Sequence, residues 1–271
     1  MMSAADRSFE GSIPEIYDRY LVPLIFEAFA CDLARRVAEA APAQVLETAA
    51  GTGVVTRALA PLLQKGARYI VSDLNQPMLN KAASRQVADE RIVWRQADAL
   101  HLPFEAHSFD AVCCQFGVMF FPDRIAGYRE ALRVLKPGGR FLFNVWDRIE
   151  HNDFARIVTD AAGSIFPSDP PRFLARTPHG YHDVQQIDAE LRKAGFSAIE
   201  IVTLQERSAA SGAREPAVAY CQGTPLRNEI EARDPDALQA VTDRSAEAIA
   251  KAHGDGPVSG KIQGHVIVAR A

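Results

Sequence analysis

The stretch VLETAAGTGVVT, from Val45 to Thr56, constrains the fold of this chain more than any other. Its apolar start predicts a short buried strand, its glycines predict a tight turn, and its last residues predict the start of a helix. Gly51 and Gly53 have no Cβ, so a ligand can approach the backbone of this turn closely. Thr52 and the first amides of the helix offer hydrogen-bond donors. The stretch therefore predicts a ligand site where the strand ends.

The acid that ends the strand, Glu47, limits what the ligand can be. A phosphate beside this carboxylate would be repelled, because both groups are anions. A ligand that is cationic, or that presents N–H and O–H donors, fits better. This favours S-adenosylmethionine (SAM), which carries an ammonium, a sulfonium and a ribose. A dinucleotide is disfavoured, also because Thr56 stands at the third position of the Gly-x-Gly-x-x-Gly/Ala pattern.

Strands and helices alternate along most of the chain. Apolar runs predict strands at residues 44–47, 68–72, 91–96, 109–116, 140–146, 196–204 and 264–269. Helical patterns cover residues 13–20, 24–40, 54–64, 77–88, 125–135, 154–165, 184–194, 213–222 and 228–252, with breaks at Pro23 and near residues 234–235. This order predicts an α/β fold with a doubly wound, mostly parallel, seven-stranded Rossmann-like sheet. The last strand is expected to pair antiparallel with residues 196–204.

Additions to the sheet are expected at three places. Residues 1–42 predict an N-terminal helical arm, and residues 43–271 the main domain. Within that domain, insertions are expected at about residues 150–185 and 213–252. Residues 166–181 are rich in Pro, Arg and His and lack a clear period, which is typical of a loop or lid.

Composition narrows the classes of partner and compartment. A net charge of −4 and a pI near 6.0 give no global attraction to nucleic acid, so none is expected as a partner. The four cysteines form no CxxC pair and no zinc-like cluster, so we expect reduced thiols, no metal and a cytoplasmic protein. No segment reaches the about 18 apolar residues of a membrane helix, so stable membrane insertion is not expected. A homodimer stays open.

Polar residues stand at or just beyond the ends of four predicted strands: Glu47, Asp73, Asp98 and Gln115. The carboxyl ends of parallel strands meet at one edge of a sheet, and ligands bind in the crevice there. We therefore expect these four side chains to converge on one cleft.

With these residues in view, the chain resembles the class I SAM-dependent methyltransferases. Within that class it is similar to the ubiquinone/menaquinone-biosynthesis C-methyltransferase-like (methyltransferase type 11) family. The resemblance covers about residues 43–147 and rests on five motifs in order: Glu47 to Gly53, Asp73 to Met78, Asp98 with Ala99, VCCQFGVMFFPD from Val112, and LKPGGRFLF from Leu135. Ala49 replaces the first glycine of the strictest form of the first motif.

The resemblance implies a set of cofactor contacts. They are Glu47, Ala49, Gly51, Thr52 and Gly53 for the methionine end, Asp73 for the two ribose hydroxyls, Leu74 and Met78 for the adenine faces, Asp98 and Ala99 for the adenine edge, and Gln115 for the methionine moiety or the methyl-transfer point. A carboxylate such as that of Asp73 can accept two O–H donors at once.

The implied activity is transfer of the SAM methyl group to a small organic acceptor by in-line displacement, which leaves S-adenosylhomocysteine (SAH). Aromatic residues in the arm and the insertions favour an aromatic or lipid-like acceptor. The base, if one is needed, is unassigned; the candidates are Tyr17, Tyr20, His179 and His182. Two alternatives stay open: a protein that binds SAM or SAH without methyl transfer, and a methyltransferase acting on protein or RNA.

Overall fold

The computed structural model describes residues 11–271, and its chain divides into two compact units. The first, here called the insertion unit, contains residues 11–26 together with Trp146–Tyr181 and Gln205–Gln263. The second, here called the sheet unit, contains Glu27–Val145, His182–Leu204 and Gly264–Ala271. Most of the two expected insertions lies in the insertion unit, but the expected arm is divided, because residues 27–42 belong to the sheet unit. The expected domain boundary at residues 42–43 stays a prediction.

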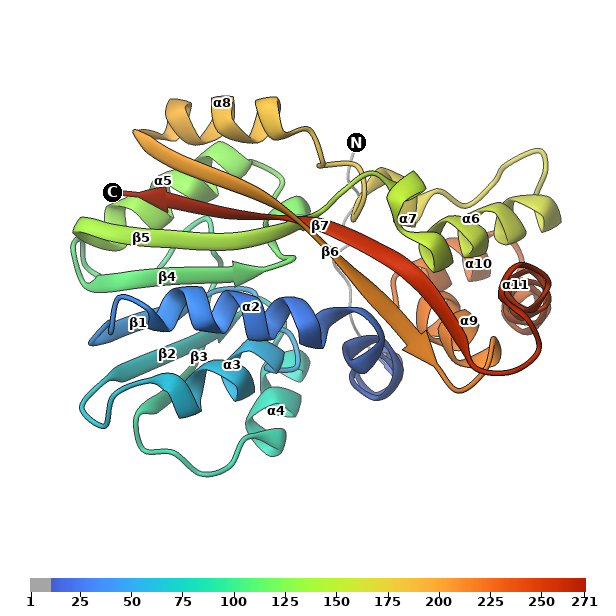
Figure 1. Ribbon diagram of the computed structural model, residues 1–271, viewed down its shortest axis with the longest axis horizontal. Coiled ribbons are helices and arrows are strands. Elements are labelled where there is room, and N and C mark those ends of the chain that lie inside the picture. The colour runs from blue at the N-terminus through green and yellow to red at the C-terminus, as the bar shows by residue number, and fades with distance from the viewer. Residues whose placement is uncertain (1–10) are drawn as a thin grey trace. The chain divides into compact units, whose positions relative to one another are not determined.

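Seven strands form one sheet in the order β3-β2-β1-β4-β5-β7-β6 (Figure 1). They are β1 Gln44–Glu47, β2 Arg68–Asp73, β3 Ile92–Gln96, β4 Phe109–Gln115, β5 Leu135–Trp146, β6 Ala198–Ala210 and β7 Val258–Arg270. The pairs β1–β2, β1–β4, β2–β3 and β4–β5 are parallel, and β7 is antiparallel. The chain builds outward from β1 to β3 and then returns to place β4 on the other side of β1. The predicted doubly wound sheet is confirmed, and its switch point lies between β1 and β4.

Helices cover both faces of the parallel strands in the sheet unit. These helices are α2 Glu27–Ala38, α3 Val54–Leu59 with the short η3 Ala60–Leu62, α4 Gln76–Arg85, η4 Val118–Phe120, α5 Arg124–Val134 and α8 Val184–Ala194. On one face, Leu33 of α2 belongs to the same buried cluster as Tyr69 of β2. On the other, Tyr128 of α5 stacks on Phe143 of β5 with ring centroids 5.5 Å apart. Burial on both faces explains why these strands are almost continuously apolar.

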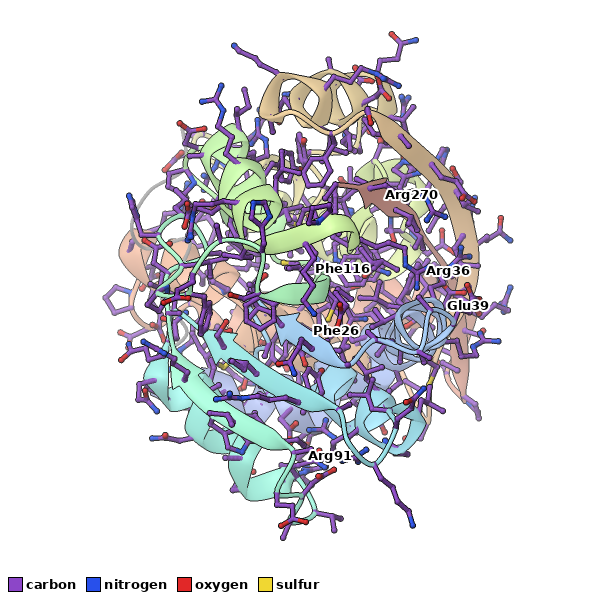
Figure 2. All side chains as sticks on the ribbon, turned by 90° about the vertical axis from the view of Figure 1, so that its left-hand side faces the viewer. Phe26, Arg36, Glu39, Arg91, Phe116 and Arg270 are labelled. Atoms are coloured by element: carbon purple, nitrogen blue, oxygen red, sulfur yellow. The ribbon has the colours of Figure 1, made fainter. Side chains whose placement is uncertain are left out.

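Arg91, the residue before β3, links the start of this strand to the end of η3 (Figure 2). Its guanidinium donates to the Asp89 carboxylate and to the backbone oxygens of Ala60, Leu63 and Gln64. These oxygens lie where the helical segment η3 ends, so the arginine adds hydrogen bonds to carbonyl groups at a helix end. Such a contact holds the edge strand against the rest of the sheet unit.

The insertion unit is mainly helical. It contains α1 Ile13–Ile16, the π-helix η2 Tyr17–Phe26, η5 Ile149–His151, α6 Asp153–Ile165, α7 Phe173–Arg176, α9 Arg214–Gln222, α10 Leu226–Arg233 and α11 Leu238–His253. Helix α11 packs on α6 and α9, and α9 packs on η2. Within residues 11–271, no helix is both long and apolar enough to cross a membrane.

Several expected boundaries differ from the structure. The expected helix break at Pro23 is wrong, because this residue lies inside the π-helix Tyr17–Phe26. Proline has no N–H and displaces the carbonyl four residues back, and the wider π register accommodates that displacement. The expected loop at residues 166–181 contains the short helix α7. Strands β6 and β7 are each 13 residues long, and more and less exposed side chains continue to alternate beyond the expected ends. The added part of β6, residues 205–210, is mostly polar, so an apolar pattern could not mark it.

The core beneath α2 gives a test of this packing. Leu33→Ala removes a fully buried side chain and should lower the free energy of unfolding by about 2–5 kcal/mol. Leu62→Ala changes a side chain that is 48% exposed and should cost about 0.5 kcal/mol or less. Urea unfolding of the two variants measures both values. Equal losses would contradict the assigned core.

Candidate cofactor site

The turn between β1 and α3 carries three left-handed residues. Gly51 and Gly53 have φ values of 56° and 78°, and Ala49 has a φ of 51°. Alanine rarely adopts this conformation, which explains why the stricter form of the motif has glycine there. The backbone N–H of Ala50 donates to the oxygen of Ser72, which ties the turn to β2. The glycines expected from the sequence are therefore required by backbone geometry.

Asp73, the last residue of β2, holds this turn in place. One carboxylate oxygen accepts from the Gly51 N–H at 2.8 Å, and the other accepts from the Asn75 N–H at 2.7 Å. Burial raises the pKa of Asp73, and the hydrogen bonds from Asn75 and Gly51 oppose that rise. Two carboxylate oxygens offer about four lone-pair positions, so the group can also accept hydroxyl donors from a ligand.

Glu47 points into the protein beneath the turn. It is 2% exposed, and its carboxylate accepts a hydrogen bond from Thr56 Oγ1 at 2.7 Å and another from the Tyr69 hydroxyl. Burial raises its pKa to about 7, although both hydroxyl bonds favour the charged form. Thr56, which breaks the dinucleotide pattern, is thus the hydroxyl donor to this acid. The Glu47 carboxylate at the end of β1 thus links Thr56 of α3 to Tyr69 of β2.

Asp98 and Ala99 follow β3. The Asp98 carboxylate accepts from the Leu100 N–H at 2.9 Å and lies 3.6 Å from His101 Nδ1. Its side chain is 45% exposed, so the second oxygen can reach a ligand. The two expected contacts to the adenine faces differ in exposure: Leu74, directly after β2, is 43% exposed, whereas Met78 of α4 is buried. Leu74 offers apolar surface to a flat ligand, and Met78 supports α4 from inside.

Buried polar atoms without partners mark the same region. Within residues 11–271, Thr52 Oγ1 and both amide atoms of Asn144 have no hydrogen-bond partner. Asn144 of β5 is in register with Gln115 of β4, so the two carboxamides share one face of the sheet. Buried polar groups usually have partners, so a polar ligand that supplies them fits these residues. Asn144 was not expected from the sequence. The feature that could have indicated it is a single amide side chain within the apolar run RFLFNVW.

The loop after β4 packs directly on the glycine turn. A Cβ at Gly117 would lie 2.5 Å from the Ala49 Cβ and 2.7 Å from Cys114 Sγ. Phe116 has a φ of 48° and packs edge-on against Phe29, with ring centroids 5.2 Å apart (Figure 2). A strained backbone beside a ligand site is typical of functional segments.

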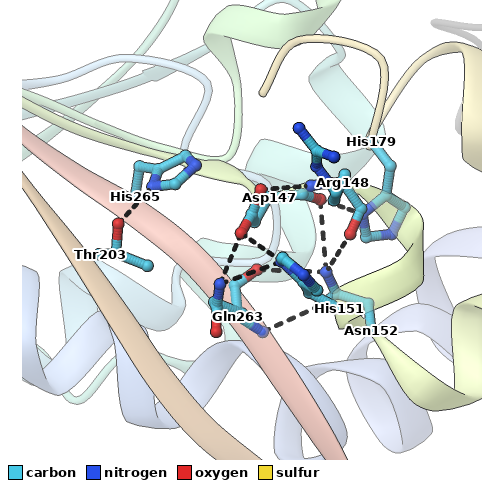
Figure 3. A network of polar contacts seen from close by, with 8 residues as sticks. All are labelled: Asp147, Arg148, His151, Asn152, His179, Thr203, Gln263 and His265. Carbon is cyan, nitrogen blue, oxygen red and sulfur yellow. Dashed lines mark hydrogen bonds and ion pairs between the residues drawn. The ribbon is translucent and has the colours of Figure 1, made fainter. Parts of the chain in front are cut away.

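The four candidate bases lie in both units. His182 is in the sheet unit, and Tyr17, Tyr20 and His179 are in the insertion unit. Tyr17 stacks on Phe26, and the Arg19 guanidinium lies 5.0 Å from the Tyr20 ring centre. His179 is buried, and its Nδ1 lies 2.8 Å from the backbone oxygen of Asp147 (Figure 3). Their roles in catalysis stay predictions.

The buried Glu47 makes stability depend on pH. The folded chain holds this proton up to about pH 7, whereas an ordinary glutamate has a pKa of 4.5, so the folded state binds more protons between these values. The contribution of Glu47 to the free energy of unfolding is therefore largest below pH 4.5. It falls as the pH rises and is smallest above about pH 7. The full difference is about 3 kcal/mol. Urea unfolding across this pH range should show a fall in wild type that Glu47→Gln largely removes.

The exposed Glu105 supplies the control for this experiment. Glu105→Gln should leave the pH dependence of the unfolding free energy at its wild-type slope. A Glu47→Gln variant with the same slope as wild type would contradict the burial of a titrating carboxyl at this position.

Contact between the glycine turn and the β4 loop is tested by adding one methyl group. Gly117→Ala should lower the free energy of unfolding by about 1–3 kcal/mol, because its Cβ meets atoms that cannot move freely. Gly66→Ala is the matched control, since nothing lies within 4 Å of a Cβ there. The midpoint temperature of thermal unfolding measures both effects. An equal decrease in the two variants would contradict this packing.

Comparisons with known proteins identify the family of this chain. The family described as "Methyltransferase domain" matches residues 46–143. A demethylmenaquinone methyltransferase of Clavibacter sepedonicus is 32% identical over 175 residues, which cover 61% of this chain and 70% of that protein. A ubiquinone/menaquinone biosynthesis C-methyltransferase of Saccharophagus degradans is 28% identical over 166 residues, which cover 57% and 67%.

Solved structures share the fold. The YcgJ protein of Bacillus subtilis has a TM-score of 0.57 at 21% identity, covering 90% of this chain and 98% of that one. Phosphoethanolamine N-methyltransferase 2 of Haemonchus contortus, solved with SAM, has a TM-score of 0.58 at 18% identity, covering 100% and 60%. With the sequence relatives, these findings give the family: the chain belongs to the class I SAM-dependent methyltransferases related to the quinone C-methyltransferases, and it is an enzyme that uses SAM.

Proposed function

We propose that the sheet unit binds SAM through the residues around the glycine turn and that the enzyme methylates a small aromatic acceptor with an acidic O–H, of the quinol type. The residues assigned to the cofactor are Glu47, Ala49, Gly51, Thr52, Gly53, Asp73, Leu74, Met78, Asp98, Ala99 and Gln115. Asp73 carries the assignment, since it joins β2 to the turn and keeps lone pairs for the ribose hydroxyls.

The chemistry follows from the cofactor. Bound SAM would supply an activated methyl group, and its transfer to the acceptor would leave SAH. The protein has to hold the acceptor in line with this bond and keep water away. Thr52 and Gln115 would orient the methionine end, and Leu74 would cover one face of the adenine.

Two observations support the acceptor class. One relative is named a demethylmenaquinone methyltransferase and another a ubiquinone/menaquinone biosynthesis C-methyltransferase, so both names refer to quinones. The insertion unit also contains many aromatic side chains, and these suit a flat apolar ligand. Among them, Trp146, Phe26, Phe173, Tyr181 and Tyr220 are buried.

The proposal includes a small-molecule partner and a cytoplasmic location. The net charge of −4 supports a small acceptor over nucleic acid. All four cysteines are free thiols, including the adjacent Cys113 and Cys114, as in the reducing cytoplasm. The homodimer stays a prediction.

Calorimetric titration with SAH tests the cofactor assignment. Wild type should bind SAH, and it should bind an analogue that lacks both ribose hydroxyls about 10–100-fold more weakly. Asp73→Asn should bind SAH more weakly and should no longer distinguish it from the analogue, because the charged acceptor of the hydroxyls is gone. Comparing the two ligands separates a direct ribose contact from a general loosening of the turn.

Asp188→Ala is the matched control, since Asp188 forms an exposed ion pair with Arg192 away from the turn. It should bind both ligands as wild type does. An Asp73→Asn variant that still distinguishes SAH from the analogue would exclude the ribose contact. Transfer of labelled methyl from SAM to naphthohydroquinone but not to catechol or phenol would support the quinol class; transfer to none of them would remove it.

A further inference from the structure

A cavity of about 670 Å³ opens at the edge of the sheet unit where the parallel strands β1, β4 and β5 begin. Figure 2 views the protein from this side and labels Glu39 and Arg270, which line the cavity. Glu47, Asp73 and Gln115, around the proposed cofactor site, stand at the opposite ends of the parallel strands. The antiparallel β7 ends at this edge, which brings Arg270 to the cavity wall. The cavity is therefore separate from the cofactor site.

Hydrogen bonds between distant segments fix the shape of this cavity. Its wall is made by residues 39–43, Asp110, residues 136–140 and Arg270. The Gly138 N–H donates to the backbone oxygen of Ala271 at 3.2 Å, and the Ala271 N–H donates to the backbone oxygen of Gly139 at 2.9 Å. These two bonds hold the end of β7 beside the first residues of β5. The position of the Arg270 backbone in the wall is therefore set by main-chain contacts.

Lys136 and Asp110 form an ion pair in this wall. Lys136 Nζ lies 2.7 Å from one carboxylate oxygen of Asp110. The other oxygen accepts from the backbone N–H groups of Ala43 and Gln44 at 3.1 and 2.8 Å. This pair joins the starts of β1, β4 and β5, and its two charges balance each other. The charges left to act on a ligand are those of Arg140, Arg270 and Glu39.

The two arginines of the cavity have no carboxylate partner of this kind. Arg140 is half-buried and donates from Nη2 to the backbone oxygens of Arg36 and Val37, at 3.1 and 3.3 Å, near the end of α2. Within residues 11–271, neither Arg140 nor Arg270 forms an ion pair. Burial lowers the pKa of Arg140, the charge of Arg270 lowers it further, and the charge of Glu39 opposes the decrease. The two guanidinium groups are therefore close enough for their charges to repel each other.

A phosphate group matches the donors that remain. Arg140 uses only Nη2 for its bonds to the described residues, so its Nε and Nη1 can donate to a ligand together with the guanidinium of Arg270. Guanidinium groups bind phosphate through paired hydrogen bonds, and a dianion between two like charges removes their repulsion. The cavity has the volume of a small-molecule site, so the phosphate can carry an organic group. The exposed Glu39 carboxylate can accept from a hydroxyl of that group.

We infer that this cavity is a second ligand site, which binds a small phosphate monoester through Arg140 and Arg270. Glu39 accepts a hydrogen bond from a hydroxyl group of the same ligand. No residue of the cavity wall belongs to the set assigned to SAM, so this inference does not depend on the proposed function.

Calorimetric titration of the full-length protein with glycerol 3-phosphate, in a buffer free of phosphate, tests this site. Wild type should bind this probe more tightly than inorganic phosphate. Arg270→Gln should bind it about tenfold more weakly, because charge-assisted hydrogen bonds are lost. Arg270 is exposed and forms no ion pair in the fold, so this variant should unfold at the wild-type temperature. Glu39→Ala should bind the two probes with about equal affinity.

Arg192→Gln is the matched control, since it removes an exposed arginine of α8 that pairs with Asp188 and does not line the cavity. It should bind glycerol 3-phosphate as wild type does, and so should Asp73→Asn, whose substitution lies in the cofactor site. No binding to wild type, or wild-type affinity in Arg270→Gln, would overturn the inference. Glycerate, a carboxylate probe, should bind more weakly; equal affinity for it would exclude the phosphate class.

Two further measurements keep the result separate from other effects. Arg270→Gln should bind SAH as wild type does, so a failure of the cofactor assignment would leave the phosphate result unchanged. Arg140→Gln should also weaken glycerol 3-phosphate binding about tenfold. Because Arg140 supports the end of α2, its variant is compared with wild type in thermal unfolding, and Arg270→Gln gives the test if that variant unfolds.

Discussion

The site depends on one buried carboxylate that accepts two backbone N–H groups. Asp73 ends β2, and its oxygens hold Gly51 of the turn after β1 and Asn75 before α4. Neither amide has a partner in a helix or strand at that point, so the carboxylate replaces the hydrogen bonds that regular structure would supply. Two neighbouring strand ends are thereby fixed to each other, and a ligand meets a turn whose shape is already set.

Much of this arrangement could be predicted from the sequence, because the signals are local. A polar residue directly after an apolar run marks the end of a buried strand, and this placed Glu47, Asp73 and Gln115 correctly at strand ends. The order of strands and helices then required a parallel sheet with these ends on one edge. The local pattern could not show in which direction a side chain points. The Glu47 carboxylate, for example, points into the protein toward Thr56 and Tyr69.

Other features depend on contacts between distant parts of the chain. Asn144 is a single polar residue inside an apolar strand, and its place beside Gln115 follows only from the register of β4 and β5. Asp147 and His151 lie close in sequence, but Gln263, which holds the aspartate, comes from the last strand. Pro23 misled the prediction because the rule that proline ends a helix assumes α-helical hydrogen bonding, and this segment is a π-helix.

The close approach of Ala49 and Gly117 links two positions that the sequence keeps far apart. A Cβ on the glycine would lie 2.5 Å from the Cβ already present on the alanine, so the interface has room for a single methyl group. In this arrangement that methyl group is on the β1 turn, where the left-handed backbone makes it costly. A glycine at position 49 would leave space for a larger residue at position 117. The residues at positions 49 and 117 should therefore vary together across the family, so that a larger residue at one position occurs with glycine at the other.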